Sequence, residues 1–97
     1  LALPTLSAGA DPSVEIIAHR GASHDAPENT VAAFTVAWEQ RADASELDVY
    51  LTKDGKLAVI HDKDTRRTAG GTSLLVAEST FADLRALDVG RWKAERF

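Results

Sequence analysis

The order of the segments within the first 51 residues restricts the fold more than any other feature of this chain. Residues 14–18 form a short apolar run after the turn-forming Asp-Pro-Ser, and residues 46–51 alternate charged and apolar side chains, so both runs predict strands. Between them lies a segment with helical periodicity. Strand, helix and strand in this order predict a βα repeat, the unit from which parallel sheets and barrels are built.

The predicted helix begins after residues 28–30, whose Glu, Asn and Thr are candidates for its N-cap. Val31, Phe34, Trp38 and the alanines between them should form its apolar face, and the helix should end near residues 40–42.

Residues 57–60 are a further β-prone run, and the Lys-Asp-Gly-Lys segment before them signals a hairpin turn. Residues 62–73 are polar and glycine-rich, which predicts a loop. Ser79 or Thr80 should then cap a short helix that runs through Leu87, because apolar residues recur there at helical spacing.

Composition limits the classes of function. Hydrophobic residues make up 44% and charged residues 27% of the chain, as in an average soluble globular protein, so no membrane insertion is expected. A formal net charge of −4 argues against nucleic acid as a partner but is compatible with a small phosphate ligand. Because the chain has no cysteine, metal ligands must be oxygen or nitrogen atoms. Its 97 residues suffice for one small domain but not for a large barrel.

Residues 1–10 are small and apolar and end in Ala-Gly-Ala, which resembles the end of a secretory signal peptide without its charged start. We interpret residues 1–13 as an extension and residues 14–97 as the folded domain. If residues 1–10 are a signal-peptide remnant, a secreted or periplasmic protein is expected; if they are an ordinary extension, a cytoplasmic one is.

Glu46 and Asp48 are candidate metal ligands. Side chains alternate along a strand, so two carboxylates separated by one residue share a face and repel each other unless a cation lies between them. Oxygen ligands at this spacing suit Mg²⁺ or Ca²⁺. The exposed face of an edge strand is the alternative reading of the same pattern.

The hairpin register decides whether His61 joins the two carboxylates. A turn of two or four residues pairs Thr52 with Leu57 and therefore places Asp48 opposite His61, on the same face. A three-residue turn shifts the register by one and points His61 the other way.

His19 and Arg20 end the first predicted strand, where βα-repeat folds build their active sites. A lone histidine is commonly a structural or surface residue, and His24 in its polar loop keeps that interpretation. His19 and His61, both at strand ends, can instead supply the base and the acid that phosphodiester cleavage needs. Arg20 can then hold the phosphate.

Five ordered blocks of the sequence support this chemistry: Ala18-His19-Arg20-Gly21-Ala22-Ser23, Pro27-Glu28-Asn29-Thr30, Glu46-Leu47-Asp48-Val49, Thr52-Lys53-Asp54-Gly55 and Ile60-His61-Asp62. They resemble the signature segments of the glycerophosphodiester phosphodiesterase family. Arg67-Thr68, Gly70-Gly71 and Leu87-Asp88-Val89-Gly90 extend the resemblance from about Val14 to the end of the chain.

The resemblance implies the N-terminal part of a TIM (β/α)8 barrel of the phospholipase-C-like phosphodiesterase type. Members hydrolyse glycerophosphodiesters to an alcohol and glycerol 3-phosphate with a divalent cation, here Ca²⁺ or Mg²⁺. By position, the resemblance implies His19 and His61 as the acid/base pair, Glu46 and Asp48 as metal ligands, and Arg20 as a phosphate contact. A role for Asn29 is open, and a helix N-cap is its alternative.

The chain departs from the family pattern in what it lacks. Family members use a further carboxylate ligand from a later strand, and such a barrel typically needs about 250 residues. We therefore expect the 97-residue chain by itself to bind metal weakly and to hydrolyse little.

Two other functions stay open. One is a related phosphodiesterase that acts on another phospholipid head group, although the Pro-Glu-Asn-Thr block favours glycerophosphodiesters. The other is a catalytically silent barrel fragment used for binding. The intact histidines and the repelling carboxylates argue against a silent fragment.

Overall fold

The computed structural model describes residues 13–97, so the expected signal-peptide remnant at residues 1–10 lies outside the described residues. None of the helices in the described part is long and apolar enough to cross a membrane. The elements follow in the order β1 (Ile17–His19), α1 (Val31–Glu39), β2 (Ala44–Glu46), β3 (Val49–Leu51), β4 (Leu57–Val59), the 3₁₀ helix η2 (Val76–Glu78) and α2 (Phe81–Arg85).

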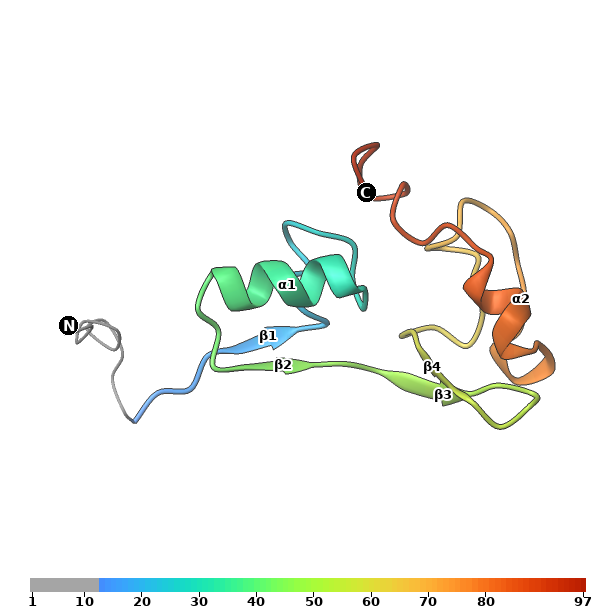
Figure 1. Cartoon of the computed structure of the whole chain (residues 1–97), viewed down its shortest axis with the longest axis horizontal. Coiled ribbons are helices and arrows are strands. Elements are labelled where there is room, and N and C mark those ends of the chain that lie inside the picture. Colours follow the sequence, from blue (N-terminus) through green and yellow to red (C-terminus); the bar gives the residue numbers. More distant parts are fainter. Residues whose placement is uncertain (1–12) are drawn as a thin grey trace.

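Strands β1 and β2 form a parallel pair with α1 as the crossover between them (Figure 1). The register places Ile17 beside Ala44 and His19 beside Glu46. This arrangement confirms the predicted βα repeat, and it brings the carboxyl ends of both strands to the same edge of the sheet.

Helix α1 begins and ends as predicted, with Thr30 as its N-cap and Gln40 as its C-cap. Its predicted apolar face is confirmed for the alanines, because Ala33 and Ala37 are buried. It is wrong for Val31 and Trp38, which are 81% and 54% exposed. Small residues are needed on the buried face because the loop after β1 lies directly against it, as described for Gly21 below.

One extended segment contains both β2 and β3. Its first half pairs in parallel with β1, and its second half pairs antiparallel with β4 (Figure 1). The predicted hairpin is therefore confirmed. This segment connects the parallel pair β1–β2 to the antiparallel pair β3–β4. Glu46 is the last residue of β2, and Asp48 directly precedes β3.

Of the two hairpin registers that the sequence left open, the structure has the one that does not pair Asp48 with His61. Leu51 pairs with Leu57 and Val49 with Val59, which places Asp48 opposite Ile60, and the Ile60 N–H donates to the Asp48 carbonyl at 2.9 Å. The turn has three residues, because the Thr52 N–H bonds to the Lys56 carbonyl and Gly55 adopts a φ of +76°. A glycine with positive φ at the end of the turn is typical of a three-residue hairpin.

The region after β4 is a loop, as predicted, fastened by a bridge between Asp64 and Leu75. Thr80 caps α2, and its hydroxyl accepts the Asp83 N–H at 3.2 Å. The helix ends at Arg85 instead of reaching Leu87, whose N–H donates to the Leu84 carbonyl in a tighter turn.

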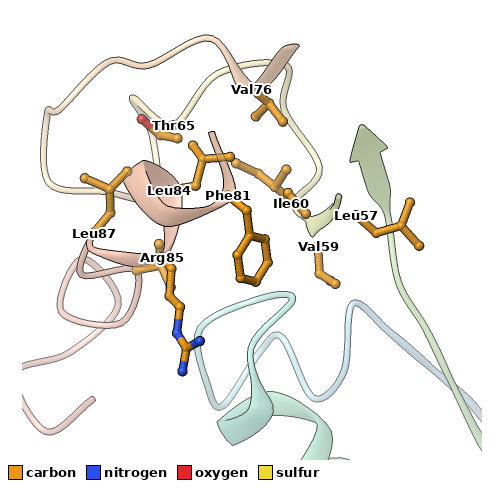
Figure 2. Close-up of a pocket in the computed structure, with 11 residues that line it drawn as sticks. Leu57, Val59, Ile60, Thr65, Val76, Phe81, Leu84, Arg85 and Leu87 are labelled. Atoms are coloured by element: carbon orange, nitrogen blue, oxygen red, sulfur yellow. The ribbon is translucent and has the colours of Figure 1, made fainter. Parts of the chain in front are cut away.

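An apolar cavity of about 270 Å³ lies between the hairpin and α2 (Figure 2). In Figure 2, Phe81 and Leu84 of α2 lie next to Val59 and Ile60 of the β4 segment, and Val76 lies above them in this view. The described residues that line this cavity include no histidine or carboxylate, so it is separate from the candidate catalytic groups.

Candidate active site

The first part of the site lies at the carboxyl ends of the parallel pair. His19 ends β1, Glu46 ends β2, and the two residues are partners in the strand register. The His19 Nε2 atom lies 3.8 Å from the Glu46 Oε1 atom, and the His19 side chain remains 69% exposed. The strand order thus places an accessible imidazole beside a predicted metal ligand, where βα folds form their active sites.

Arg20 connects this strand edge to the other predicted ligand. Its backbone N–H donates to Glu46 Oε1 at 3.0 Å, and its Nη1 donates to Glu28 Oε1 at 3.3 Å. Its Nε atom lies 3.4 Å from Asp48 Oδ2 but is buried without a hydrogen-bond partner among the described residues. Arg20 also has a φ of +60°, an uncommon conformation for a side chain of this size.

Asn29 holds Asp48 in place. The Asn29 Nδ2 atom donates to Asp48 Oδ2 at 3.0 Å, and its Oδ1 accepts the Asp48 backbone N–H at 3.3 Å. Asn29 is 8% exposed and has a φ of +57°, which asparagine tolerates better than most residues. Its alternative role as the helix N-cap is wrong, because Thr30 occupies that position.

The two carboxylates have the right chemistry for a divalent cation but form only part of a cage. Both are partly exposed oxygen ligands, as Mg²⁺ and Ca²⁺ prefer. Their hydrogen bonds to Arg20 and Asn29 use Glu46 Oε1 and Asp48 Oδ2, and each carboxylate keeps a second oxygen. Within residues 13–97, no group of three or more histidine, cysteine, aspartate or glutamate residues could hold a metal ion. Glu46 and Asp48 would therefore supply only two of the six or more ligands that such a cation takes.

His61 reaches the site through tertiary packing and not through the hairpin register. It is the second residue after β4 and lines a small hollow of about 40 Å³ together with Glu28, Asn29 and Thr68. Its side chain is 45% exposed, and its Nδ1 atom lies 2.8 Å from Asp62 Oδ1. His61 is therefore a neighbour of Asn29, which in turn contacts Asp48.

A network of charges surrounds His61 and Arg20. Arg67 Nη1 and Nη2 donate to the two oxygens of Glu28 at 3.0 and 2.6 Å, and its Nε and Nη2 donate to the two oxygens of Asp62 at 2.9 and 3.1 Å. These are bidentate arginine–carboxylate pairs, the strongest geometry for such contacts.

The network shifts the protonation equilibria of its members. The hydrogen bonds from Arg67, and next the one with His61, lower the pKa of Asp62 to about 2. The bonds from Arg67 also lower the pKa of Glu28 despite its partial burial, and Glu28 and Asp62 raise the pKa of Arg67. Both carboxylates are therefore ionised at neutral pH.

The structure links four of the five predicted site residues directly: His19, Arg20, Glu46 and Asp48. His61 lies outside this group and is near it only through Glu28 and Asn29, which line the same hollow. His24 lines a different hollow beside Gln40 and Ala42, in agreement with its interpretation as a residue without a role in the site.

The sequence motifs give Glu28, Asp62 and Arg67 no role in the site, although all three lie in segments that resemble the family. The adjacency of Asp62 to His61 was a usable signal, because a carboxylate next to a catalytic imidazole often orients it. The pairing of Arg67 with Glu28 spans 39 residues and leaves no local pattern.

Comparisons with known proteins find relatives over most of this chain. Residues 19–97 match the model of the glycerophosphoryl diester phosphodiesterase family. A glycerophosphodiester phosphodiesterase from Caldanaerobacter subterraneus subsp. tengcongensis is 50% identical over 82 residues, which cover 84% of this chain and 33% of that protein.

Two solved structures are similar to this one. The glycerophosphodiester phosphodiesterase from Agrobacterium tumefaciens has a TM-score of 0.82 and 44% identity, covering 87% of this chain and 36% of that one. An Oleispira antarctica phosphodiesterase in complex with the product sn-glycerol-3-phosphate has a TM-score of 0.81 and 38% identity, covering 86% and 33%. The chain thus spans about a third of the length of the relatives it matches and has the fold of the corresponding part of their TIM barrel.

Proposed function

Because this chain belongs to the glycerophosphoryl diester phosphodiesterase family, we propose that the protein hydrolyses glycerophosphodiesters to an alcohol and glycerol 3-phosphate. The observation that carries the proposal is the strand edge where His19 and Glu46 are partners and the Arg20 N–H bonds to the Glu46 carboxylate. The glycerol 3-phosphate product bound by the Oleispira antarctica relative supports the same class of substrate.

In the proposed mechanism, His19 and His61 are the acid/base pair. One imidazole removes the proton from the attacking oxygen as the new P–O bond forms, and the other protonates the alcohol oxygen as its P–O bond breaks. Imidazoles suit both tasks because their usual pKa lies close to neutral pH. Both side chains are accessible, at 69% and 45% exposure.

Arg20 is proposed to bind the phosphoryl oxygens, and Glu46 and Asp48 are proposed to hold a divalent cation. When bound, the cation supplies positive charge that stabilises the phosphoryl oxygens in the transition state. The chain itself orients the ligands, because Asn29 fixes one Asp48 oxygen and the Arg20 N–H fixes one Glu46 oxygen. Glu28 binds Arg20 from the other side and keeps its guanidinium beside Asp48.

The first prediction tests the acid/base pair. We expect His19→Ala and His61→Ala each to lower kcat about 100- to 10,000-fold, because a positioned acid or base contributes that much. The measurement is release of glycerol 3-phosphate from glycerophosphocholine by a full-length version with the whole barrel domain, because the 97-residue chain by itself is expected to hydrolyse little. Sphingomyelin is the alternative substrate.

His24→Ala is the matched control, because His24 lines a different hollow, and it should keep the activity of the unmodified protein. Undiminished hydrolysis by both His19→Ala and His61→Ala would contradict the acid/base assignment. Turnover of sphingomyelin without release of glycerol 3-phosphate would contradict the proposed substrate class.

A further inference from the structure

We propose that Asp62 is a positioning residue that holds His61 in one tautomer for catalysis, and that Arg67 holds Asp62 and also connects it to the phosphate-binding Arg20. This inference rests on the proposed function, because it assigns the supporting residues of the same acid/base pair. Neither side chain would touch the substrate itself.

The contact between His61 and Asp62 defines the tautomer. The His61 Nδ1 atom lies 2.8 Å from Asp62 Oδ1, which is hydrogen-bond distance. Asp62 is ionised at neutral pH, and an ionised carboxylate can only accept hydrogen bonds. The proton must therefore lie on Nδ1, so that in the neutral ring Nε2 carries the lone pair that a general base needs.

Arg67 fixes the position of the carboxylate. It contacts both oxygens of Asp62, through Nε at 2.9 Å and Nη2 at 3.1 Å. An aspartate side chain held at both oxygens by a planar guanidinium has little freedom to rotate. Since Asp62 Oδ1 accepts from both Arg67 and His61, the orientation of the imidazole depends on Arg67 as well.

Arg67 also contacts Glu28, which connects it to Arg20. Its Nη2 donates to Glu28 Oε1 at 2.6 Å, and the same oxygen accepts from Arg20 Nη1 at 3.3 Å. The Glu28 side chain is 11% exposed and separates two guanidinium groups that would otherwise repel each other. A continuous series of polar contacts and ion pairs thus joins His61, Asp62, Arg67, Glu28, Arg20 and Asp48.

The arrangement gives Arg67 two distinct effects. Through Asp62 it acts on the proton-transfer group, and through Glu28 it acts on the group proposed to bind phosphate. Loss of Asp62 should therefore reduce kcat with little change in KM. Loss of Arg67 should reduce kcat and also raise KM.

The experiment compares Asp62→Ala and Arg67→Met with Asp64→Ala. Asp64 lies in the same loop, but its carboxylate bonds to the Arg66 backbone N–H and not to the network. The ring ¹⁵N chemical shifts of His61 report the tautomer in protein without substrate, and glycerophosphocholine hydrolysis gives kcat and KM. Asp62→Asn keeps the shape of the side chain and serves as a second variant if Asp62→Ala does not fold.

We expect Nδ1–H to be the major neutral tautomer of His61 in the unmodified protein and in Asp64→Ala. In Asp62→Ala it should be replaced mainly by Nε2–H, and kcat should fall about 10- to 100-fold, the usual effect of losing a group that orients a functional side chain. Arg67→Met should shift the tautomer partly and raise KM.

Two results overturn the inference: a major Nε2–H tautomer in the unmodified protein, or equal kcat values for Asp62→Ala and Asp64→Ala. Either result leaves the proposed function intact as long as the unmodified protein releases glycerol 3-phosphate. Failure of the unmodified full-length version to hydrolyse any glycerophosphodiester overturns the function instead, and the tautomer is measured independently of that outcome.

Discussion

At the scale of single residues, positive φ angles mark the loop between β1 and α1. Arg20, Gly21 and Asn29 all have φ between +57° and +78°. Such angles are unfavourable for residues with a side chain and persist only where surrounding contacts impose them. Here the contacts are the bonds of Arg20 to Glu46 and of Asn29 to Asp48, so the strained backbone is used to hold the candidate metal ligands.

Gly21 is required for a second reason, its close approach to α1. A Cβ atom at Gly21 would lie 2.7 Å from the Ala33 Cβ and 2.8 Å from its backbone carbon, closer than side chains tolerate. The Ala22 N–H also bonds to the Ala33 carbonyl at 2.9 Å, which keeps the loop against the helix. Gly21 therefore sets the distance between α1 and the strand end that carries His19 and Arg20.

The second prediction concerns Gly21. We expect Gly21→Ala to lower the free energy of unfolding by about 2–4 kcal/mol, because the added methyl group combines overpacking with an unfavourable φ. Urea unfolding measures this change. Gly70→Ala is the control, since Gly70 has a φ of +64° but no atom within 4 Å of an added Cβ, and it should cost only about 1 kcal/mol. Equal losses for both variants would show that the contact with Ala33 is unimportant.

At the scale of elements, the N-cap of α1 connects the helix to the loop that carries Glu28 and Asn29. The Thr30 hydroxyl accepts the Ala33 N–H at 3.2 Å and donates to the Pro27 carbonyl at 2.6 Å. One side chain therefore closes the loop from Pro27 to Thr30 and starts the helix. Correct placement of Asn29 beside Asp48 depends on this closure.

The third prediction tests this cap. Thr30→Ala should lower the free energy of unfolding by about 1–2 kcal/mol, because it leaves a helix N–H without its partner. The measurement is urea unfolding followed by circular dichroism. Thr35→Ala makes the same substitution at an exposed position within α1, where alanine favours helix, and it should be neutral or slightly stabilising. A comparable loss for Thr35→Ala would contradict the capping role.

At the scale of the whole molecule, the described residues bury little apolar surface. The buried hydrophobic residues are four alanines and Val76. Large apolar side chains of the strands are exposed, among them Ile17 at 55%, Leu51 at 62% and Leu57 at 61%. Exposed apolar strand faces of this kind need further protein to cover them, as the sheet of a barrel does.

The fourth prediction is that the 97-residue chain by itself binds Ca²⁺ or Mg²⁺ with a Kd of about 1 mM or weaker. Two carboxylates supply too few of the ligands that either cation requires, and the described residues offer no third nearby. Isothermal titration calorimetry measures the affinity, and Glu46→Gln should abolish what binding there is. A micromolar Kd for the 97-residue chain would contradict the assignment of Glu46 and Asp48 as a partial site.

The sequence by itself determined the local elements and the types of chemical group. Strand, helix and hairpin follow from periodicity and from turn residues that act over a few positions, so the βα repeat, the Thr80 cap and the hairpin were predictable. The motif blocks likewise nominated His19, Arg20, Glu46, Asp48 and His61 as candidate site residues, because each has a residue type that phosphodiester chemistry needs.

Only the tertiary structure decided how these groups meet. The hairpin register depends on the conformation of one glycine, Gly55, and the three-residue turn shifts it by one residue from the register that would pair Asp48 with His61. His61 reaches the site instead through Asn29, Glu28 and Arg67, whose contacts span 19 to 39 residues. Charges so far apart in the chain leave no periodic pattern, because their distance is set by how the two halves of the structure pack and not by local geometry.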